Sequence, residues 1–201
     1  MSESAAATRP TRGAGLLEGF LARQRARQAN RLIPSRLRGG RILDVGCGSF
    51  PYFLSHTSFR EKLAIERRRP PDAPEGIEWH ELDLNRDAEL PFEDGHVDVV
   101  TMLAVIEHLD PSALEGLLAE VHRVLAPGGR LIITTPAAWS DPLLRWMAGV
   151  GLVSAEEIDE HAFAYTHSLI GWYFGRAAFR RDGVRFGYFE MRLNLWATAD
   201  R

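Results

Sequence analysis

Three acidic residues, Asp44, Glu66 and Asp83, fall at the carboxyl ends of the first three strands that the sequence predicts. The acids are therefore expected at the carboxyl edge of a sheet, where α/β proteins bind ligands. Ionised carboxylates accept hydrogen bonds and attract positive charge. Because no lysine or arginine stands in the adjoining glycine turn, this edge is a poor phosphate site. It suits a ligand that offers hydroxyls, amines and positive charge.

The turn after the first run, Gly46-Cys47-Gly48, allows backbone to approach a ligand closely. An ordinary strand-to-helix turn is the simplest interpretation. A dinucleotide site is another, but its fingerprint requires a third glycine at the position that Pro51 occupies. NAD and FAD are therefore disfavoured.

The spacing of the acids indicates a nucleoside without phosphate. Glu66 follows Gly46 by 20 residues, where an acid can accept both hydroxyls of a ribose. Asp83 can accept from an adenine amine, and the backbone around Leu84 can serve a ring nitrogen. S-adenosylmethionine fits this set, because it carries a ribose, an adenine, an ammonium and a sulfonium.

The elements that position these residues alternate between apolar runs and helical or loop segments. Strands are expected at residues 41–45, 62–66, 77–82, 96–103 and 130–135, and helices at 16–32 and 111–125. Such alternation predicts a parallel sheet covered on both faces. Further helices are expected at 141–150 and 168–179, and further strands at 184–191 and 193–198. Because the link between the last two strands is too short for a crossover, one of them must run antiparallel.

Five segments in order resemble the motifs of class I S-adenosylmethionine-dependent methyltransferases of the small-molecule, methyltransferase-11-like type. They are LDVGCG, AIE, ELDLN, LPFEDGHVDVVTMLAVIEHL and VHRVLAPGGRLIITTP, within about residues 40–136. The resemblance implies an α/β, Rossmann-like, doubly wound fold. Its seven-stranded, mostly parallel sheet has one antiparallel strand and helices on both faces.

The resemblance also implies the cofactor contacts. Asp44, Gly46 and Gly48 would contact the methionyl part, Glu66 the ribose, Asp83 with Leu84 the adenine, and Leu103 would lie beside the cofactor. Phe50 departs from the family, which commonly has a third glycine there. Since phenylalanine does not enter positive φ cheaply, either this turn keeps a negative φ at Phe50 or the loop is reshaped around Pro51.

Methyl transfer needs a general base only where the acceptor must lose a proton. His108, His161 and His167 are the candidate catalytic residues. His108 follows the fourth strand, and the other two lie after the fifth, where such enzymes carry substrate-facing elements. A structural hydrogen bond or a helix cap is the competing interpretation for each. No metal site is expected, because no histidine-rich or aspartate-rich spacing occurs.

The chain has 201 residues, 45% hydrophobic and 25% charged, which is typical of one globular domain. We expect residues 1–15 to form a disordered arm. Residues 16–201 are expected to form a single methyltransferase domain with an N-terminal helix at 16–38 and a substrate lid at 137–182. No apolar run is long enough to span a bilayer, and no secretory signal is recognised. The single cysteine excludes an internal disulfide and fits a cytoplasmic location.

Partners follow from charge and aromatic content. Residues 1–41 carry nine arginines against two glutamates, but lysine occurs once in the chain, and with Phe20 as the one aromatic residue of this stretch there is no aromatic interleaving. Nucleic acid is therefore a disfavoured partner. Aromatic residues between 137 and 182 indicate an apolar pocket or a homodimer contact.

The expected function is methyl transfer to a small-molecule acceptor. The alternatives are a non-catalytic S-adenosylmethionine-binding or regulatory protein, and a nucleic-acid methyltransferase that uses the basic arm.

Overall fold

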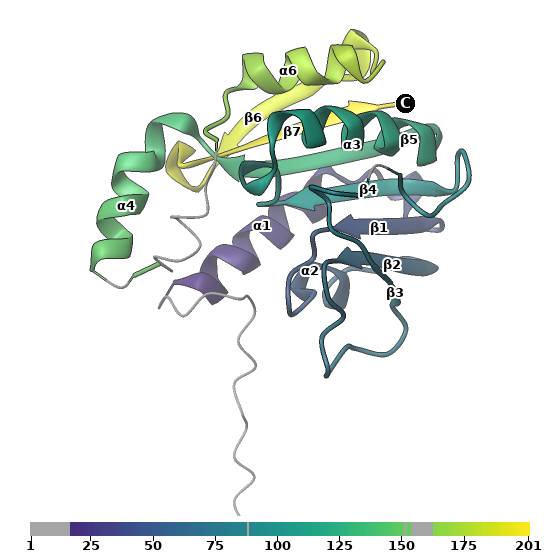
Figure 1. The fold of residues 1–201 in the computed structure, drawn as a ribbon, viewed down its shortest axis with the longest axis horizontal. Coiled ribbons are helices and arrows are strands. Elements are labelled where there is room, and N and C mark those ends of the chain that lie inside the picture. The colour runs from purple at the N-terminus through teal and green to yellow at the C-terminus, as the bar shows by residue number, and fades with distance from the viewer. Residues whose placement is uncertain (1–16, 88, 151, 154–162) are drawn as a thin grey trace, which may run out of the picture.

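The apolar runs form one seven-stranded sheet in the computed structural model of the chain, which is described at residues 17–87, 89–150, 152–153 and 163–201 (Figure 1). The strands are β1 (Arg41–Val45), β2 (Glu61–Glu66), β3 (Glu78–Glu81), β4 (Val97–Leu103), β5 (Leu125–Pro136), β6 (Arg185–Phe189) and β7 (Asn194–Asp200). Their order across the sheet is β3-β2-β1-β4-β5-β7-β6. Only β7 runs antiparallel to its neighbours, so the predicted doubly wound sheet with one antiparallel strand is confirmed. The arm expected at residues 1–15 lies outside the described residues.

Alternation along the strands buries both faces of the sheet. One face packs against α1 (Glu18–Leu32) and the short α2 (Tyr52–Ser55), with Ile42 of β1 and Val99 of β4 in the same apolar cluster as Ala29 of α1. The other face packs against α3 (Pro111–Val124) and α6 (His167–Arg176), and includes the neighbouring strand residues Leu43 and Val100. The central strands β1 and β4 are therefore apolar on both sides, as their nearly continuous runs predicted, whereas no residue of the edge strand β3 is buried.

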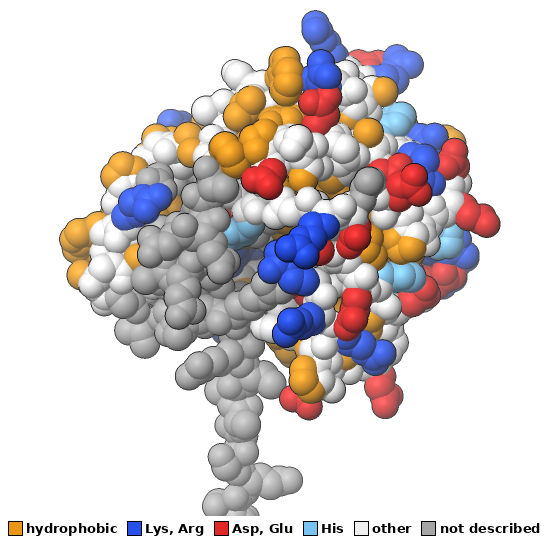
Figure 2. Space-filling model, in the orientation of Figure 1, with side chains coloured by type: hydrophobic (Ala, Val, Ile, Leu, Met, Phe, Trp, Pro, Cys, Tyr) orange, Lys and Arg blue, Asp and Glu red, His pale blue; other side chains and the backbone are white. Residues whose placement is uncertain are grey.

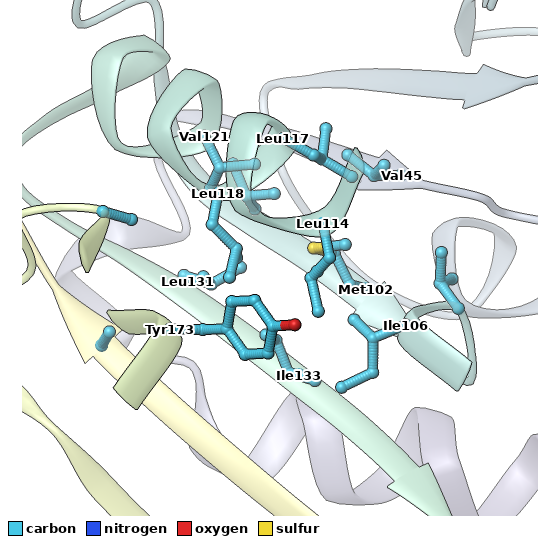
Figure 3. Packing of buried hydrophobic residues seen from close by; sticks show 14 of the residues in the cluster. Val45, Met102, Ile106, Leu114, Leu117, Leu118, Val121, Leu131, Ile133 and Tyr173 are labelled. Atoms are coloured by element: carbon cyan, nitrogen blue, oxygen red, sulfur yellow. The ribbon is translucent and has the colours of Figure 1, made fainter. Parts of the chain in front are cut away.

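The larger core lies between α3 and the sheet (Figure 3). Leu114, Leu118 and Val121 recur at helical spacing and point toward Met102 of β4 and Leu131 of β5. Each side chain is buried, and full burial of such a side chain contributes about 1.5–3 kcal/mol. This core fixes the ends of β4 and β5, where the predicted site residues lie.

β5 begins earlier than the sequence predicted. Residues 130–135 were expected, but the strand starts at Leu125, which pairs with Val97 of β4 before the register shifts. The Pro127-Gly128-Gly129 segment therefore continues the strand, with Gly128 at a φ of 76°. A proline and two glycines predicted a break, and the irregular pairing accommodates them.

The segment expected to form a substrate lid divides into two parts. α6 belongs to the core, because Tyr173 and Phe174 are buried against α3 and the sheet. α4 (Asp141–Gly149) instead stands beyond the carboxyl ends of the strands (Figure 1). Its outward face is apolar, with Trp146 61% exposed, and Figure 2 shows hydrophobic side chains gathered over α4 and α6. Within the described part of the chain, no helix has the length and apolar character to cross a membrane.

Candidate active site

A cavity of about 550 Å³ opens along the carboxyl edge of the sheet. Residues from the ends of β1, β2, β4 and β5 line it, together with the loop after β3 and the start of β7. It contains all seven residues predicted to contact the cofactor: Asp44, Gly46, Gly48, Glu66, Asp83, Leu84 and Leu103. Residues separated by up to 59 positions in the chain are thus brought to one surface, as parallel strand ends require.

The glycine turn has the backbone that only glycine adopts easily. φ is 72° at Gly46 and 75° at Gly48. A Cβ on Gly46 would also lie 2.8 Å from Cγ2 of Val105, whereas a Cβ on Gly48 would meet nothing within 4 Å. Phe50 has no positive φ, and α2 begins two residues later. The first of the two alternatives for Phe50 is therefore correct, and its ring adds to the cavity wall.

Glu66 fastens this turn to the end of β2. Its Oε2 accepts a hydrogen bond from the amide of Gly48 at 2.8 Å, and its Oε1 accepts one from the amide of Arg67 at 3.0 Å. The residue is 7% exposed. Each carboxylate oxygen has a further lone pair, so the same group can also accept from a ligand hydroxyl.

Asp44 is the most deeply buried acid of the cofactor end, at 3% exposure. Thr101 of β4 donates its hydroxyl to Oδ1 at 2.6 Å. Burial raises the pKa of Asp44 to about 7, the Thr101 hydrogen bond opposes this rise, and the charge of Glu66 adds to it. Two acids at the end of adjacent strands make this part of the cavity attractive to a cation.

The loop after β3 is held in place by its own side chains. Oδ1 of Asp83 accepts from the amide of Asn85 at 3.2 Å, and Nε of Arg67 lies 3.5 Å from Oδ2. Oδ1 of Asn85 in turn accepts from the amide of Asp110 at 3.0 Å. The loop is thus tied to the segment after β4, which closes this end of the cavity.

The three candidate histidines have different surroundings. His108 lines the cavity at the end of a 3-10 turn, Ile106–His108. His167 does not line it, because its Nε2 donates to the carbonyl of Gly187 at 3.1 Å and its ring packs on Tyr188. His161 lies outside the described residues. Of the two candidates that the structure describes, it therefore brings His108, and not His167, together with the predicted cofactor residues.

Sequence reasoning missed several polar residues of the cavity, among them Arg25, Glu107, Glu190 and Asn194. Glu107 is 2% exposed and accepts from the hydroxyl of Thr135 at 2.9 Å, and burial raises its pKa. Glu190 directly follows β6, which ends at Phe189, whereas the strand expected at residues 184–191 placed this acid inside the strand. Arg25 belongs to α1. The spacing of apolar residues in that helix shows only that its other face is polar, and does not show which arginine lines the cavity.

Apolar walls close the far end of the cavity. They comprise Leu21 and Ala22 of α1, Leu144 and Met147 of α4, and Val153. Among the described residues, no group of three or more His, Cys, Asp or Glu side chains could hold a metal ion. The residues present thus offer a site for an organic ligand that is polar at one end and apolar at the other.

Comparison with known proteins gives consistent matches. A family model described as a methyltransferase domain matches residues 17–188. The ubiquinone/menaquinone biosynthesis C-methyltransferase UbiE of Desulfotalea psychrophila is 30% identical over 143 residues, which make up 63% of this chain and 56% of that protein. The chain thus spans about half the length of this curated relative.

Solved structures share the fold. An S-adenosylmethionine-dependent methyltransferase from Mesorhizobium loti has a TM-score of 0.65 at 17% identity, covering 90% of this chain and 100% of that chain. A SAM-dependent methyltransferase from Archaeoglobus fulgidus has a TM-score of 0.66 at 16% identity, covering 88% of this chain and 92% of that chain. At these identities the likeness concerns the fold alone.

Proposed function

Since the chain belongs to the methyltransferase domain family, whose model covers residues 17–188, we propose that it transfers a methyl group from S-adenosylmethionine to a small-molecule acceptor. When bound, S-adenosylmethionine supplies a methyl group activated by a sulfonium. The protein must then bind both reactants, align them and exclude water, because alignment is the main requirement of such a displacement.

The cofactor end of the cavity fits this ligand in its chemistry. In the proposal, Glu66 accepts from the ribose hydroxyls, Asp83 and the backbone of Leu84 serve the adenine, and Asp44 with the glycine turn holds the methionyl part. The buried Asp44, with its raised pKa, supports this assignment, because a ligand ammonium would supply a positive charge beside two acids, Asp44 and Glu66. Arg25 supplies a cation for an anionic group of a ligand.

The observation that carries the proposal is that one cavity continues past the cofactor residues. It runs from the end of β2 across β1, β4 and β5 to the start of β7. Four strand spacings of about 4.8 Å give roughly 19 Å between the Glu66 end and the Asn194 end. Glu66 and Asp83 belong to one end, and the apolar walls from α1 and α4 belong to the other. A second, partly apolar reactant fits that second end.

Calorimetry with S-adenosylmethionine and S-adenosylhomocysteine tests the first half of the proposal. Release of S-adenosylhomocysteine during incubation with a panel of phenols, amines and carboxylic acids tests the second. Absence of binding would refute the cofactor assignment. Binding without turnover on any acceptor would favour the non-catalytic alternative.

The location of the protein and its partners stay predictions. The single cysteine, Cys47, supports a reducing cytoplasm as the place of action. The exposed apolar face of α4 supports either a contact between two copies or a contact with a larger acceptor. Arg23, Arg27 and Arg31 form an exposed basic row on α1, and Phe20, one turn before Arg23, is exposed beside them. One phenyl ring offers little surface for base stacking, so nucleic acid remains disfavoured.

A further inference from the structure

Glu190 lies at the same edge of the sheet as Asp44 and Glu66. It directly follows β6, and β6 is parallel to β5 because both pair antiparallel with β7. β5 is in turn parallel to β4 and β1. The carboxyl end of β6 therefore faces the cavity, and Glu190 forms part of its wall.

The turn that begins with Glu190 is strained. Glu190, Met191 and Arg192 have φ values of 49°, 53° and 71°, all in the left-handed region. None of the three is glycine, and this conformation costs other residues about 1–2 kcal/mol each. Such strain persists where the surrounding structure imposes it, and it concentrates at functional sites.

The Glu190 carboxylate is held on one side only. Nδ2 of Asn194, the first residue of β7, donates to its Oε2. Its Oε1 is buried and has no hydrogen-bond partner among the residues that the structure describes. Burial raises the pKa of Glu190, and the charge of Arg25 partly opposes the rise. A buried oxygen without a donor is costly, so this atom is suited to a ligand N–H or O–H.

The position of Glu190 separates it from the cofactor residues. Pro136, which ends β5, pairs with Asn194, and both line the cavity with Glu190 at the end farthest from Glu66. The same cavity is lined by the apolar Leu144 and Met147 of α4 and by Arg25 of α1, whose charge opposes the effect of burial on Glu190 without cancelling it. A desolvated carboxylate is a stronger base than one in water, which general-base catalysis requires near neutral pH.

We propose that Glu190 binds the acceptor through an O–H or N–H group and takes up its proton during methyl transfer. This inference rests on the proposed function. As the acceptor oxygen or nitrogen bonds to the methyl carbon, the carbon–sulfur bond breaks and its electron pair stays on sulfur. The proton of the acceptor passes to the Glu190 carboxylate, so charge and atoms balance. The acceptor class is a largely apolar small molecule with a hydroxyl or amine.

Sinefungin provides a test that needs no identified acceptor. In this cofactor analogue a carbon replaces the sulfur and carries an amine at the position of the transferred methyl group, whereas S-adenosylhomocysteine has no group at that position. We would measure both dissociation constants by calorimetry for the wild type, for Glu190→Gln and for Glu93→Gln, an exposed acid in the loop before β4. Glutamine at 190 keeps an oxygen for Asn194, and thermal unfolding would verify that the variant folds.

Glu190→Gln is expected to weaken sinefungin at least fivefold and to leave S-adenosylhomocysteine within twofold. The reason is that a carboxylate within about 5 Å of a bound ammonium contributes more than this factor near a protein surface. Glu93→Gln should change neither constant. Equal loss of both ligands, or loss of neither, would overturn the role of Glu190 while leaving the proposed function intact. Failure of the wild type to bind either ligand would instead refute the proposed function itself, and this inference with it.

Discussion

Glu66 at the end of β2 and Gly48 in the turn after β1 are joined by a hydrogen bond of 2.8 Å from the glycine amide to the carboxylate. The acid therefore fixes the left-handed backbone of the turn and at the same time faces the cavity. Its second oxygen holds the amide of Arg67 at 3.0 Å. A carboxylate has two accepting oxygens and no donor. It can therefore accept hydrogen bonds from both amides and from a ligand as well, which explains an acid at this position.

Glu66→Ala is expected to weaken S-adenosylhomocysteine binding about fivefold to 150-fold, which corresponds to the 1–3 kcal/mol of charge-assisted hydrogen bonds. Glu66→Gln should fall between the wild type and Glu66→Ala, because an amide keeps one accepting oxygen. Calorimetry measures both, with Glu75→Gln in the exposed loop before β3 as the control. Unchanged affinity in Glu66→Ala would refute its role in the cofactor site.

The buried Asp44 lowers the free energy of unfolding of the ligand-free protein at neutral and alkaline pH. Its pKa is raised from 3.8 to about 7, mainly by burial. Between these two pH values the folded protein binds a proton that the unfolded chain has released. The free energy of unfolding therefore falls as pH rises through this range, and the loss is complete above about pH 7.

Asp44→Asn should accordingly raise the melting temperature of the ligand-free protein by several degrees at pH 8, since about 1 kcal/mol corresponds to about 2–4 °C in a domain of this size. Below about pH 4 the wild-type carboxyl is protonated in both states, so the gain should disappear. Calorimetric or fluorescence melting at the two pH values measures this. A lower melting temperature at pH 8 would show that the Asp44 charge stabilises the fold.

The same group predicts a pH dependence of cofactor affinity. A ligand ammonium binds best to ionised Asp44. At acid pH the carboxyl is protonated, so it must first lose its proton, and this cost weakens binding. S-adenosylhomocysteine affinity should fall by up to about tenfold per pH unit below about 7. Asp44→Asn should bind more weakly than the wild type at pH 8 and show a flatter profile. A wild-type profile without this decline would place the ammonium elsewhere.

The cofactor end of the site was predictable because it depends on local patterns. An apolar run followed by an acid fixes both a strand and the side chain at its carboxyl edge, so Asp44, Glu66 and Asp83 were found without knowledge of the pairing. Seven predicted residues line one cavity for this reason. The presence of one antiparallel strand was predictable for a similar reason, because the link between the last two strands is too short for a crossover.

The acceptor end was not predictable in this way, because long-range packing forms it. Glu190 stood inside the strand expected at residues 184–191, and its place at the cavity depends both on the end of β6 at Phe189 and on the parallel direction of β6 and β1. Arg25 lines the cavity because of the way α1 packs against one face of the sheet, which the sequence of the helix does not reveal. His167 stands in a polar segment where such enzymes carry substrate-facing residues. In the structure, however, its ring donates a hydrogen bond to the carbonyl of Gly187, 20 positions away. The early start of β5 depends on the irregular pairing of Leu125 with Val97.

The two glycines of the turn provide a matched test of strain against crowding. Gly48→Ala should cost about 1–2 kcal/mol of unfolding free energy, because only the left-handed φ of 75° opposes it. Gly46→Ala should cost more, because its Cβ would lie 2.8 Å from Val105. The double variant Gly46→Ala/Val105→Ala should lose less than the sum of its two single changes. Denaturant unfolding measures all four, and equal costs for the two glycines would contradict the crowding argument.

His167 and His108 should separate stability from binding. His167→Ala removes the 3.1 Å hydrogen bond to Gly187 and the ring contact with Tyr188, at a centroid distance of 4.5 Å. It should lower the free energy of unfolding by about 1 kcal/mol and leave S-adenosylhomocysteine affinity within twofold. His108→Ala, in the cavity wall, should change that affinity more than threefold and affect unfolding less. Because denaturant unfolding and calorimetry report the two effects independently, the reverse pattern would return His167 to the active site as a catalytic candidate.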